Sequence, residues 1–398
     1  NQRVGHYWLR APDLAPSEAI TEAVVGSQRA CLELALGVDD SIRDILLIGI
    51  GGSALGPQLV GEALGPTPAM RQLHLMDNTD PDGMVNVLSR LAPRQTLVLV
   101  VSKSGSTAET LNGLTLTGRF YEAAGVELAP HCVAITTPGS SLERRARAEG
   151  WRGVLPLWDW VGGRTSVTSA VGLAPGHLLG IPMDALLEGA AAMDAATRTP
   201  DPMANPAALL AAAWHGANGA NRARAMVVLP YRDRLALLGR YLQQLIMESV
   251  GKSHTRSGEL IHHGLAVFGH KGSTDQHSLV QQLRDGPDDN FVLFVEVLEE
   301  LSDDPEIRPD VTAGDVLSGF LAGTRDALNQ AGRSSLTLTL DRLDARAVGA
   351  MVALFERAVG LYASLLDINA YHQPGVEAGK RGAATTLELQ ARVLDALR

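Results

Sequence analysis

The chain has only two cysteines, Cys31 and Cys132, and they lie far apart in the sequence. This count excludes a disulfide framework and a cysteine-rich zinc site, and it predicts a reducing compartment. Aromatic residues are also scarce, at 4% of the chain. Alanine, leucine, valine and glycine must therefore do most of the packing, which suits helices laid closely on a parallel sheet better than an all-β sandwich.

The chain has fewer basic than acidic residues: 34 Lys and Arg against 44 Asp and Glu, which gives a formal net charge of −10. Such a chain is a poor candidate for binding nucleic acid or an anionic membrane surface through its overall charge. We find no run of 18 apolar residues, and residues 1–10 do not resemble a signal peptide. We therefore expect a cytoplasmic protein without nucleic-acid or membrane partners, in which any anionic ligand meets a locally positive site.

What the chain does have is a repeated alternation of short apolar runs and longer amphipathic segments. This rhythm predicts βαβ units and parallel sheets. The expected strands are Asp44–Ile50, Gln72–Met76, Thr96–Val101, His131–Thr136, Val154–Trp158, Ala225–Pro230, Leu265–Gly269, Asn290–Val297 and Ser335–Leu340. We predict an α/β fold of two three-layer α/β/α sandwiches, residues 1–190 and 191–398, with a linker near residues 184–204. The expected C-terminal helices are one near Ala347–Leu366 and one that ends the chain.

Two loops follow predicted strands and open predicted helices. In the first, Gly51 and Gly52 precede Ser53, which suits a tight turn that presents helix N–H groups to an anion. Its spacing does not match the dinucleotide fingerprint, since no third glycine stands where that motif needs one. The second loop contains four hydroxyl groups and a lysine within six residues: Ser102, Lys103, Ser104, Ser106 and Thr107. A helix cap formed by Ser106 and Glu109 would use one hydroxyl, so this density favours binding of a phosphate monoester.

Four segments together resemble the phosphoglucose isomerase family, which is built from sugar isomerase domains. They are GIGGSALGP at residues 49–57, SKSGSTAET at 102–110, QHS at 276–278 and QPGVEAGK at 373–380. The resemblance extends from about residue 45 to 380. It implies an aldose–ketose isomerase that converts glucose 6-phosphate to fructose 6-phosphate through a cis-enediol intermediate, with no cofactor and no metal.

The resemblance also implies roles for residues of the central chemistry. Glu248 matches the family's base, and a carboxylate suits that task when a partly apolar site raises its pKa from about 4.3 toward neutrality. Gln244 stands four residues earlier, on the same helix face. Gly163 and Arg164 match the segment that stabilises the negative charge of the enediolate.

The remaining family matches concern ring opening and subunit structure. His277 matches the acid–base that opens the sugar ring, and Lys380 matches a lysine near the ring oxygen. In the family this histidine comes from the neighbouring subunit, so the resemblance implies a homodimer. Gln373 favours glucose over mannose substrates, because relatives that also use mannose 6-phosphate tend to have threonine there.

Two alternatives remain open. A dual phosphoglucose/phosphomannose isomerase would share these motifs, and a non-catalytic sugar-phosphate sensor would share the serine-rich loop. A sensor would not need Glu248, His277 and Lys380 together. Five histidines between His254 and His277 invite a metal site, but their spacing fits no paired-histidine helix motif.

Overall fold

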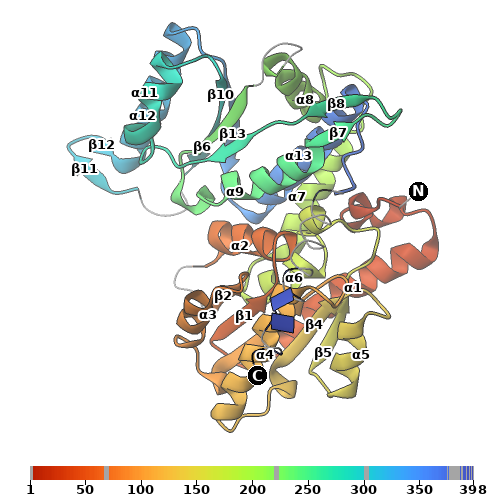
Figure 1. The fold of residues 1–398 in the computed structure, drawn as a ribbon. Coiled ribbons are helices and arrows are strands. Elements are labelled where there is room, and N and C mark those ends of the chain that lie inside the picture. Colours follow the sequence, from red (N-terminus) through yellow and green to blue (C-terminus); the bar gives the residue numbers. More distant parts are fainter. Residues whose placement is uncertain are drawn as a thin grey trace.

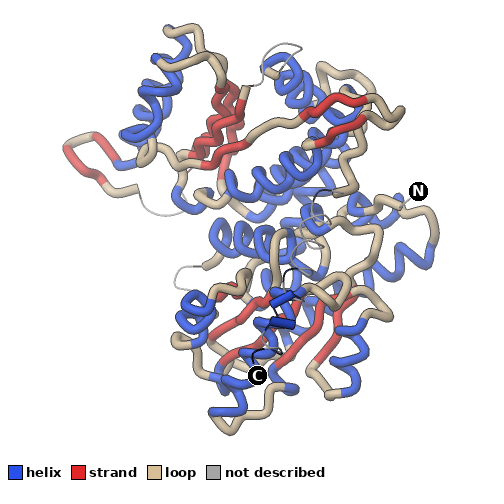
Figure 2. The backbone as a smooth tube through the Cα atoms, in the orientation of Figure 1, coloured by secondary structure: helices blue, strands red, loops and turns tan. Residues whose placement is uncertain are grey.

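The computed structural model describes residues 3–66, 71–218, 224–299, 304–373 and 375, with isolated residues and pairs between 386 and 397. It shows an α/β fold in which two parallel sheets are flanked by helices, as predicted (Figures 1 and 2). The first sheet lies in the lower part of Figure 1 and the second in the upper part. Of the terminal helix predicted at the end of the chain, only these isolated residues and pairs are described, and they are helical.

The first sheet has the strand order β2-β1-β3-β4-β5, and every neighbouring pair is parallel. Its strands are β1 (Asp44–Ile48), β2 (Gln72–Met76), β3 (Thr96–Val101), β4 (Cys132–Thr136) and β5 (Gly153–Pro156). The strands β3 and β4 are buried along their whole length. Helices cover both faces of this sheet, which explains why these strands appear in the sequence as unbroken apolar runs.

The second sheet has the order β13-β10-β6-β9 and is also parallel. Its strands are β6 (Ala225–Pro230), β9 (Val267–Gly269), β10 (Asn290–Glu299) and β13 (Ser335–Arg342). Two antiparallel pairs were not predicted: β7 (Lys252–His254) with β8 (Leu260–His263), and β11 (Glu306–Arg308) with β12 (Val311–Thr312). Each of these four strands has four residues or fewer, too few to show a clear alternating pattern in the sequence.

The helices of the first half of the chain are α1 (Glu18–Leu36), α2 (Gly52–Leu64), α3 (Pro81–Leu88), α4 (Ala108–Ala123), α5 (Ser141–Ala148), α6 (Ala170–Leu178) and α7 (Met183–Ala196). Those of the second half are α8 (Pro206–Ala217), α9 (Leu238–Leu242), α10 (Glu248–Val250), α11 (Gln276–Asp285), α12 (Ala313–Gln330) and α13 (Ala345–Leu365). Polar side chains cap the N-termini of several helices. The carboxylate of Asp80 accepts a hydrogen bond from the N–H of Gly83 in α3, and that of Asp344 accepts one from the N–H of Ala347 in α13.

The segment expected to be a linker is the helix α7, which packs against α13. A Cβ atom on Gly349 would lie 1.9 Å from the carbonyl oxygen of Leu186, and one on Gly189 would lie 1.9 Å from that of Arg346. The glycines therefore allow the two helix backbones to touch. Residues 184–196 of the predicted linker thus form a packed helix, because an alanine-rich stretch favours helix, and residues 197–204 connect α7 to α8.

One hydrophobic cluster includes Ile45 of β1, Leu186 of α7, Leu293 of β10 and Val352 of α13, so the two sheets share a core. The division at residue 190 falls within α7 and stays a prediction.

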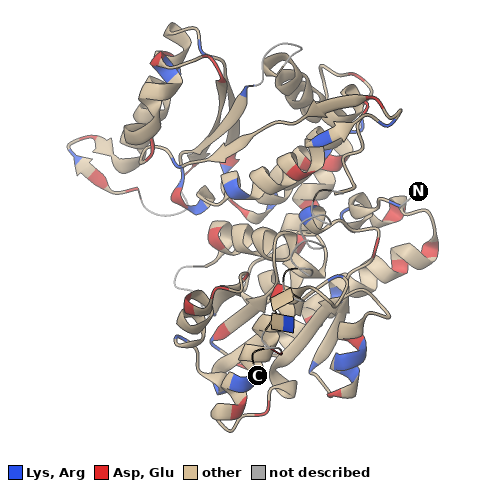
Figure 3. Ribbon diagram, in the orientation of Figure 1, with Lys and Arg blue, Asp and Glu red and all other residues tan. Residues whose placement is uncertain are grey.

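By length and composition alone α13 is apolar enough to span a membrane, but 67% of its most apolar window is buried inside the protein, as in a core helix. Figure 3 shows acidic and basic residues interspersed along the ribbon around both sheets.

Candidate active site

The site begins where the strand order of the first sheet reverses. From β1 the chain crosses to β2 on one side, and then to β3 on the other side. The loops that leave the carboxyl ends of β1 and β3 therefore diverge and open a crevice, the usual ligand position in an open parallel sheet. These are the two glycine- and serine-rich loops that the sequence analysis selected.

The loop after β1 makes room for two other segments. Gly51 has a φ of +58°, and a Cβ atom there would lie 3.0 Å from Nε2 of Gln244. A Cβ atom on Gly52 would lie 2.0 Å from the carbonyl oxygen of Gly163. The glycines thus bring the start of α2, which includes Ser53, against the segments that carry Gly163 and Gln244.

The serine-rich turn after β3 is organised by its own hydroxyl groups. Ser102 is buried; its Oγ donates to Oγ1 of Thr107 at 3.1 Å and accepts from the N–H of Gly105 at 3.1 Å. Ser106 donates through Oγ to the hydroxyl of Ser104 at 3.0 Å, and both residues are exposed. The helix α4 begins at Ala108, and the side chain of its N-cap residue, Thr107, forms no capping hydrogen bond among the described residues. The alternative of a cap formed by Ser106 and Glu109 is therefore not what the described turn shows.

Lys103 faces a neighbouring loop. Its ammonium donates to the carbonyl oxygens of Asp159 at 2.6 Å and Val161 at 2.9 Å, and burial lowers its pKa. These bonds hold the loop that leads to Gly163. Direct contact of Lys103 with a phosphate stays a prediction.

Arg164 lies in the 3₁₀ turn Gly163–Thr165 and is 6% exposed. Its guanidinium donates to Oγ of Ser249 at 2.7 Å, to Oε1 of Glu248 at 3.0 Å and to Oε1 of Gln373 at 3.2 Å, as well as to the carbonyl oxygen of Ala370. Burial lowers the pKa of Arg164, and the nearby carboxylate of Glu248 opposes that effect. The sequence identified this arginine but not the four partners, which come from two distant segments.

Glu248 follows a π-helical turn, Gln243–Met247, between α9 and α10. Such turns often occur at functional sites, where they shift a side chain relative to its helix. The carboxylate accepts from Nη1 of Arg164 and, at 3.1 Å, from Nε2 of Gln244; it is 19% exposed. Its immediate surroundings are thus polar and charged, whereas the apolar neighbours in the sequence had indicated a partly apolar site.

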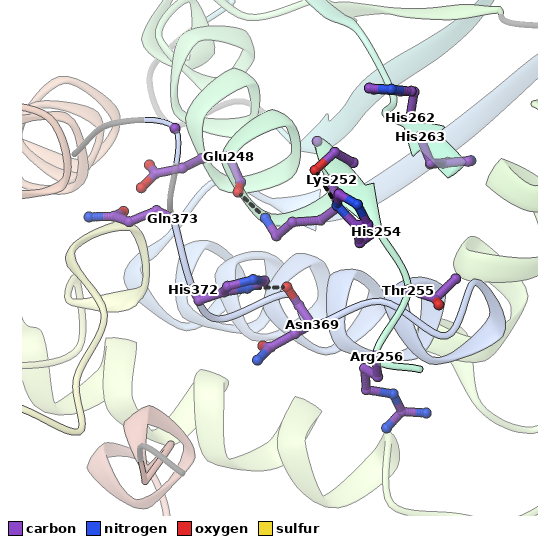
Figure 4. A pocket seen from close by; sticks show the side chains of 13 residues that line it. Glu248, Lys252, His254, Thr255, Arg256, His262, His263, Asn369, His372 and Gln373 are labelled. Carbon is purple, nitrogen blue, oxygen red and sulfur yellow. Dashed lines mark hydrogen bonds between the residues drawn. The ribbon is translucent and has the colours of Figure 1, made fainter. Parts of the chain in front are cut away.

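A cavity of about 1150 Å³ opens beside Glu248. Figure 4 shows Glu248 and Gln373 at one end of it, His372 and Lys252 in the middle, and His262 and His263 at the opposite end. A second cavity of about 610 Å³ lies on the Arg164 side, and both are lined by Asn369, His372 and Gln373. The segment 369–373 therefore lines both cavities, of which one is also lined by Glu248 and the other by Arg164.

Lys252 is a site residue that the sequence analysis did not select. Its Nζ donates to the backbone carbonyl oxygen of Glu248 at 2.8 Å, and only 7% of the residue is exposed. Burial, with the nearby Arg164, lowers its pKa to about 8. Its spacing of four residues from Glu248, which would put both residues on one face of a predicted helix, was the available signal.

The two cavities include only some of the predicted site residues. Glu248 and Gln373 line the larger cavity, and Lys103, Gly163, Arg164 and Gln373 line the smaller one. The described predicted residues that line neither cavity are Gly52, Ser53, Ser102, Ser104, Ser106, Thr107, Gln244 and His277. His277 lies in the first turn of α11, is exposed, and does not line either cavity. Lys380 lies outside the described residues. His254, His262 and His263 line the larger cavity, and among the described residues no group of three or more His, Cys, Asp or Glu side chains is arranged to hold a metal ion.

Comparison with known proteins agrees with the four sequence motifs. The family described as Phosphoglucose isomerase matches residues 35–330 and 326–393. A glucose-6-phosphate isomerase from Synechococcus sp. (strain JA-3-3Ab) is 54% identical over 100% of this chain and 77% of its own length, and one from Geobacter sp. (strain M21) is 52% identical over the same shares. The crystal structure of a glucose-6-phosphate isomerase from Chlamydia trachomatis superposes with a TM-score of 0.90 at 29% identity, covering 99% of this chain and 82% of that one.

Proposed function

Because the chain belongs to the phosphoglucose isomerase family and interconverts glucose 6-phosphate and fructose 6-phosphate, we propose a role in this reaction for each of its site residues. The observation that carries the proposal is the contact between Glu248 and Arg164, 3.0 Å apart at the wall of the cavity. A carboxylate base and a fixed cation are the two groups that an enediolate intermediate requires.

In this proposal Glu248 moves the proton. Its carboxylate takes the proton from C2 of the open-chain aldose, and the electron pair of that C–H bond becomes the C1–C2 double bond while the O1 oxygen gains negative charge. The same carboxyl group then returns a proton to C1, and the hydroxyl proton of O2 is lost as the C2 carbonyl forms and O1 is protonated. Gln244, which donates to Oε2 at 3.1 Å, fixes the plane of the carboxylate during both transfers.

Arg164 stabilises the enediolate. Its guanidinium already has four hydrogen-bonded partners, so its position is set before substrate arrives. Fixed donors of this kind act on charge as it develops without reorganising, which lowers the barrier rather than tightening the ground state.

The serine-rich turn holds the phosphate. Ser104 and Ser106 are exposed at the carboxyl end of β3, and the uncapped N-terminus of α4 directs its first N–H groups to the same place. Gly52 and Ser53, at the uncapped N-terminus of α2, complete the anion-binding side of the crevice. These donors supply the local positive field that an acidic protein needs for an anionic substrate.

A second subunit completes the site. His277 is exposed on α11 and does not line the cavity of its own chain, and the family resemblance assigns ring opening to this histidine from a neighbouring copy. We therefore propose a homodimer in which each chain contributes His277 to the active site of its partner. In this proposal Lys380 assists at the ring oxygen and Gln373 contacts the sugar. Both cysteines are buried and unpaired, which suits a reducing, cytoplasmic setting.

A coupled assay tests the function directly. Fructose 6-phosphate is supplied with EDTA present, and glucose 6-phosphate is detected with an NADP-dependent dehydrogenase. We expect sustained turnover, with mannose 6-phosphate giving a much lower rate in a parallel assay. Comparable rates on both substrates would instead support a dual phosphoglucose/phosphomannose isomerase, and a folded, sugar-phosphate-binding but inactive protein would contradict the proposal.

A further inference from the structure

Arg164 is held by two segments that are far apart in the sequence. One is the turn Gly163–Thr165, at the end of the loop that contains Trp160. The other is the segment 369–373, in which Ala370 and Gln373 accept hydrogen bonds from the guanidinium. The direction of the guanidinium therefore depends on the relative position of these two segments, in addition to its hydrogen bonds to Glu248 and Ser249.

The N-terminal residues contact both of them. The N–H of Gly5 donates to the carbonyl oxygen of Trp160 at 3.0 Å, and the rings of Trp8 and Trp160 lie 5.3 Å apart. On the other side, the hydroxyl oxygens of Tyr7 and Tyr371 are 2.9 Å apart. A Cβ atom on Gly5 would lie 2.3 Å from the ring of Trp8 and 2.6 Å from that of Trp160, so the backbone fits tightly between the indoles.

A buried charge cluster anchors this N-terminal segment to the helices that join the two sheets. Arg10 donates to Asp194 of α7 at 3.2 Å and to Glu356 of α13. The ring of Tyr7 contacts two guanidinium groups, with the central carbon of Arg357 at 4.1 Å and that of Arg10 at 5.1 Å from its centroid. The side chains of Arg10, Asp194 and Glu356 are at most 2% exposed, so the anchor lies in the protein interior.

We propose that the segment Gly5–Arg10 is a positioning element for Arg164, and that the hydrogen bond between Tyr7 and Tyr371 transfers its position to the segment 369–373. His6 and Tyr371 line the smaller cavity, but neither Tyr371 nor any residue of Gly5–Arg10 lines the larger cavity beside Glu248. They act by keeping the guanidinium aligned with the carboxylate of Glu248. The inference rests on the proposed role of Arg164 in stabilising the enediolate.

The test is a double-mutant cycle of Tyr7→Phe and Tyr371→Phe, with kcat and KM measured for each variant. Phenylalanine at position 7 keeps the ring in contact with the two guanidinium groups and removes only the hydroxyl. We expect each single variant to lower kcat about 3- to 10-fold with KM nearly unchanged, since small displacements of an aligned group act on the transition state. We expect the double variant to be no slower than the slower single variant.

Tyr121→Phe is the matched control. Tyr121 is buried in the first sheet's core and donates its hydroxyl to the carbonyl oxygen of Thr96 at 2.8 Å, remote from the segment 369–373. Its loss of a buried hydrogen bond should lower the melting temperature while leaving kcat at the wild-type value. Tyr371 is 38% exposed, so we expect Tyr371→Phe to fold, and this variant still tests the proposal if Tyr7→Phe does not fold.

An unchanged kcat in Tyr371→Phe, or reductions that multiply in the double variant, would overturn the inference while leaving the proposed function intact. The Arg164→Lys variant separates the two proposals. If it keeps the wild-type kcat, the role of Arg164 itself is wrong. If it is slow, adding Tyr7→Phe should reduce its kcat no further.

Discussion

Glu248 and Arg164 are bound to each other before any substrate is present, with Nη1 of the guanidinium 3.0 Å from Oε1 of the carboxylate. The same Nη1 also donates to Gln373 at 3.2 Å. One nitrogen of the proposed cation, Nη1 of Arg164, therefore donates both to the proposed base and to Gln373. Substrate oxygens must therefore compete with Glu248 and Gln373 for this donor, while Ser249 and Ala370 keep the guanidinium in place.

Replacing Arg164 by lysine should lower kcat about 100-fold, with a smaller change in KM. Lysine keeps the charge but lacks the planar fork that reaches four partners at once. Arg346→Lys is the control, because its pair with Glu188 is more than half exposed and such pairs contribute little. Steady-state kinetics on both variants check this; equal rates for the two would contradict the role of Arg164.

The substitution Gly52→Ala should damage the site through backbone contact. The new Cβ atom would lie 2.0 Å from the carbonyl oxygen of Gly163, so the turn that carries Arg164 must move. We expect a kcat at least about 10-fold lower and a free energy of unfolding lower by about 1–3 kcal/mol.

Gly26→Ala is the control variant: nothing lies within 4 Å of its Cβ position in α1. It should stabilise the protein by about 0.5–1 kcal/mol with kcat unchanged. Urea titrations and kinetics on both variants decide the matter.

Lys252 should give the free energy of unfolding a recognisable pH dependence. Its pKa in the folded protein is lowered to about 8, against an ordinary value of 10.5. Between these values the unfolded chain holds a proton that the folded chain has lost, so raising the pH through this window favours the folded state. Relative to Lys252→Met, the wild type should gain about 1–3 kcal/mol from pH 8 to pH 10.5. Urea titrations across that window measure the difference, and parallel curves for the two proteins would show that the lysine is not buried as described.

The shared site predicts complementation between inactive subunits. Glu248→Gln and His277→Ala should each be inactive alone, but mixed dimers contain one site with both intact residues. After subunit exchange at equal concentrations, about a quarter of the wild-type activity should return, since half the dimers are mixed and each has one good site of two. Glu248→Gln mixed with Arg164→Lys is the control. Both changes affect groups of the same chain, so no mixed site is intact. Recovery in neither mixture would indicate that His277 serves its own chain or none.

The sequence was a good guide where short-range patterns decide structure. Continuous apolar runs such as Thr96–Val101 and Ala225–Pro230 became β3 and β6 with the same bounds, because a strand buried on both faces needs an unbroken apolar run. The loops at Gly51 and Ser102 were found for a similar reason, since tight turns and helix N-termini require particular residues within a few positions.

The features that the sequence did not reveal depend on contacts between distant segments. The π-helical turn before Glu248 leaves no clear composition signal, and the polar surroundings of its carboxylate come from Arg164, which is 84 residues away. Lys103 was expected in the phosphate site, but its ammonium is directed to carbonyl oxygens near Trp160. Such partners are set by tertiary packing, which local propensity does not encode.

Solvent deuterium exchange tests the central claim that Glu248 shuttles the proton. Sugar phosphate is incubated in D₂O with the wild type or with Glu248→Gln, and deuterium at C1 and C2 is followed by NMR. The account predicts exchange by the wild type and at least about 100-fold slower exchange by the variant, which should still bind fructose 6-phosphate. If Glu248→Gln exchanged deuterium at the wild-type rate, another group would be the base, and the mechanism proposed for this cavity would be wrong.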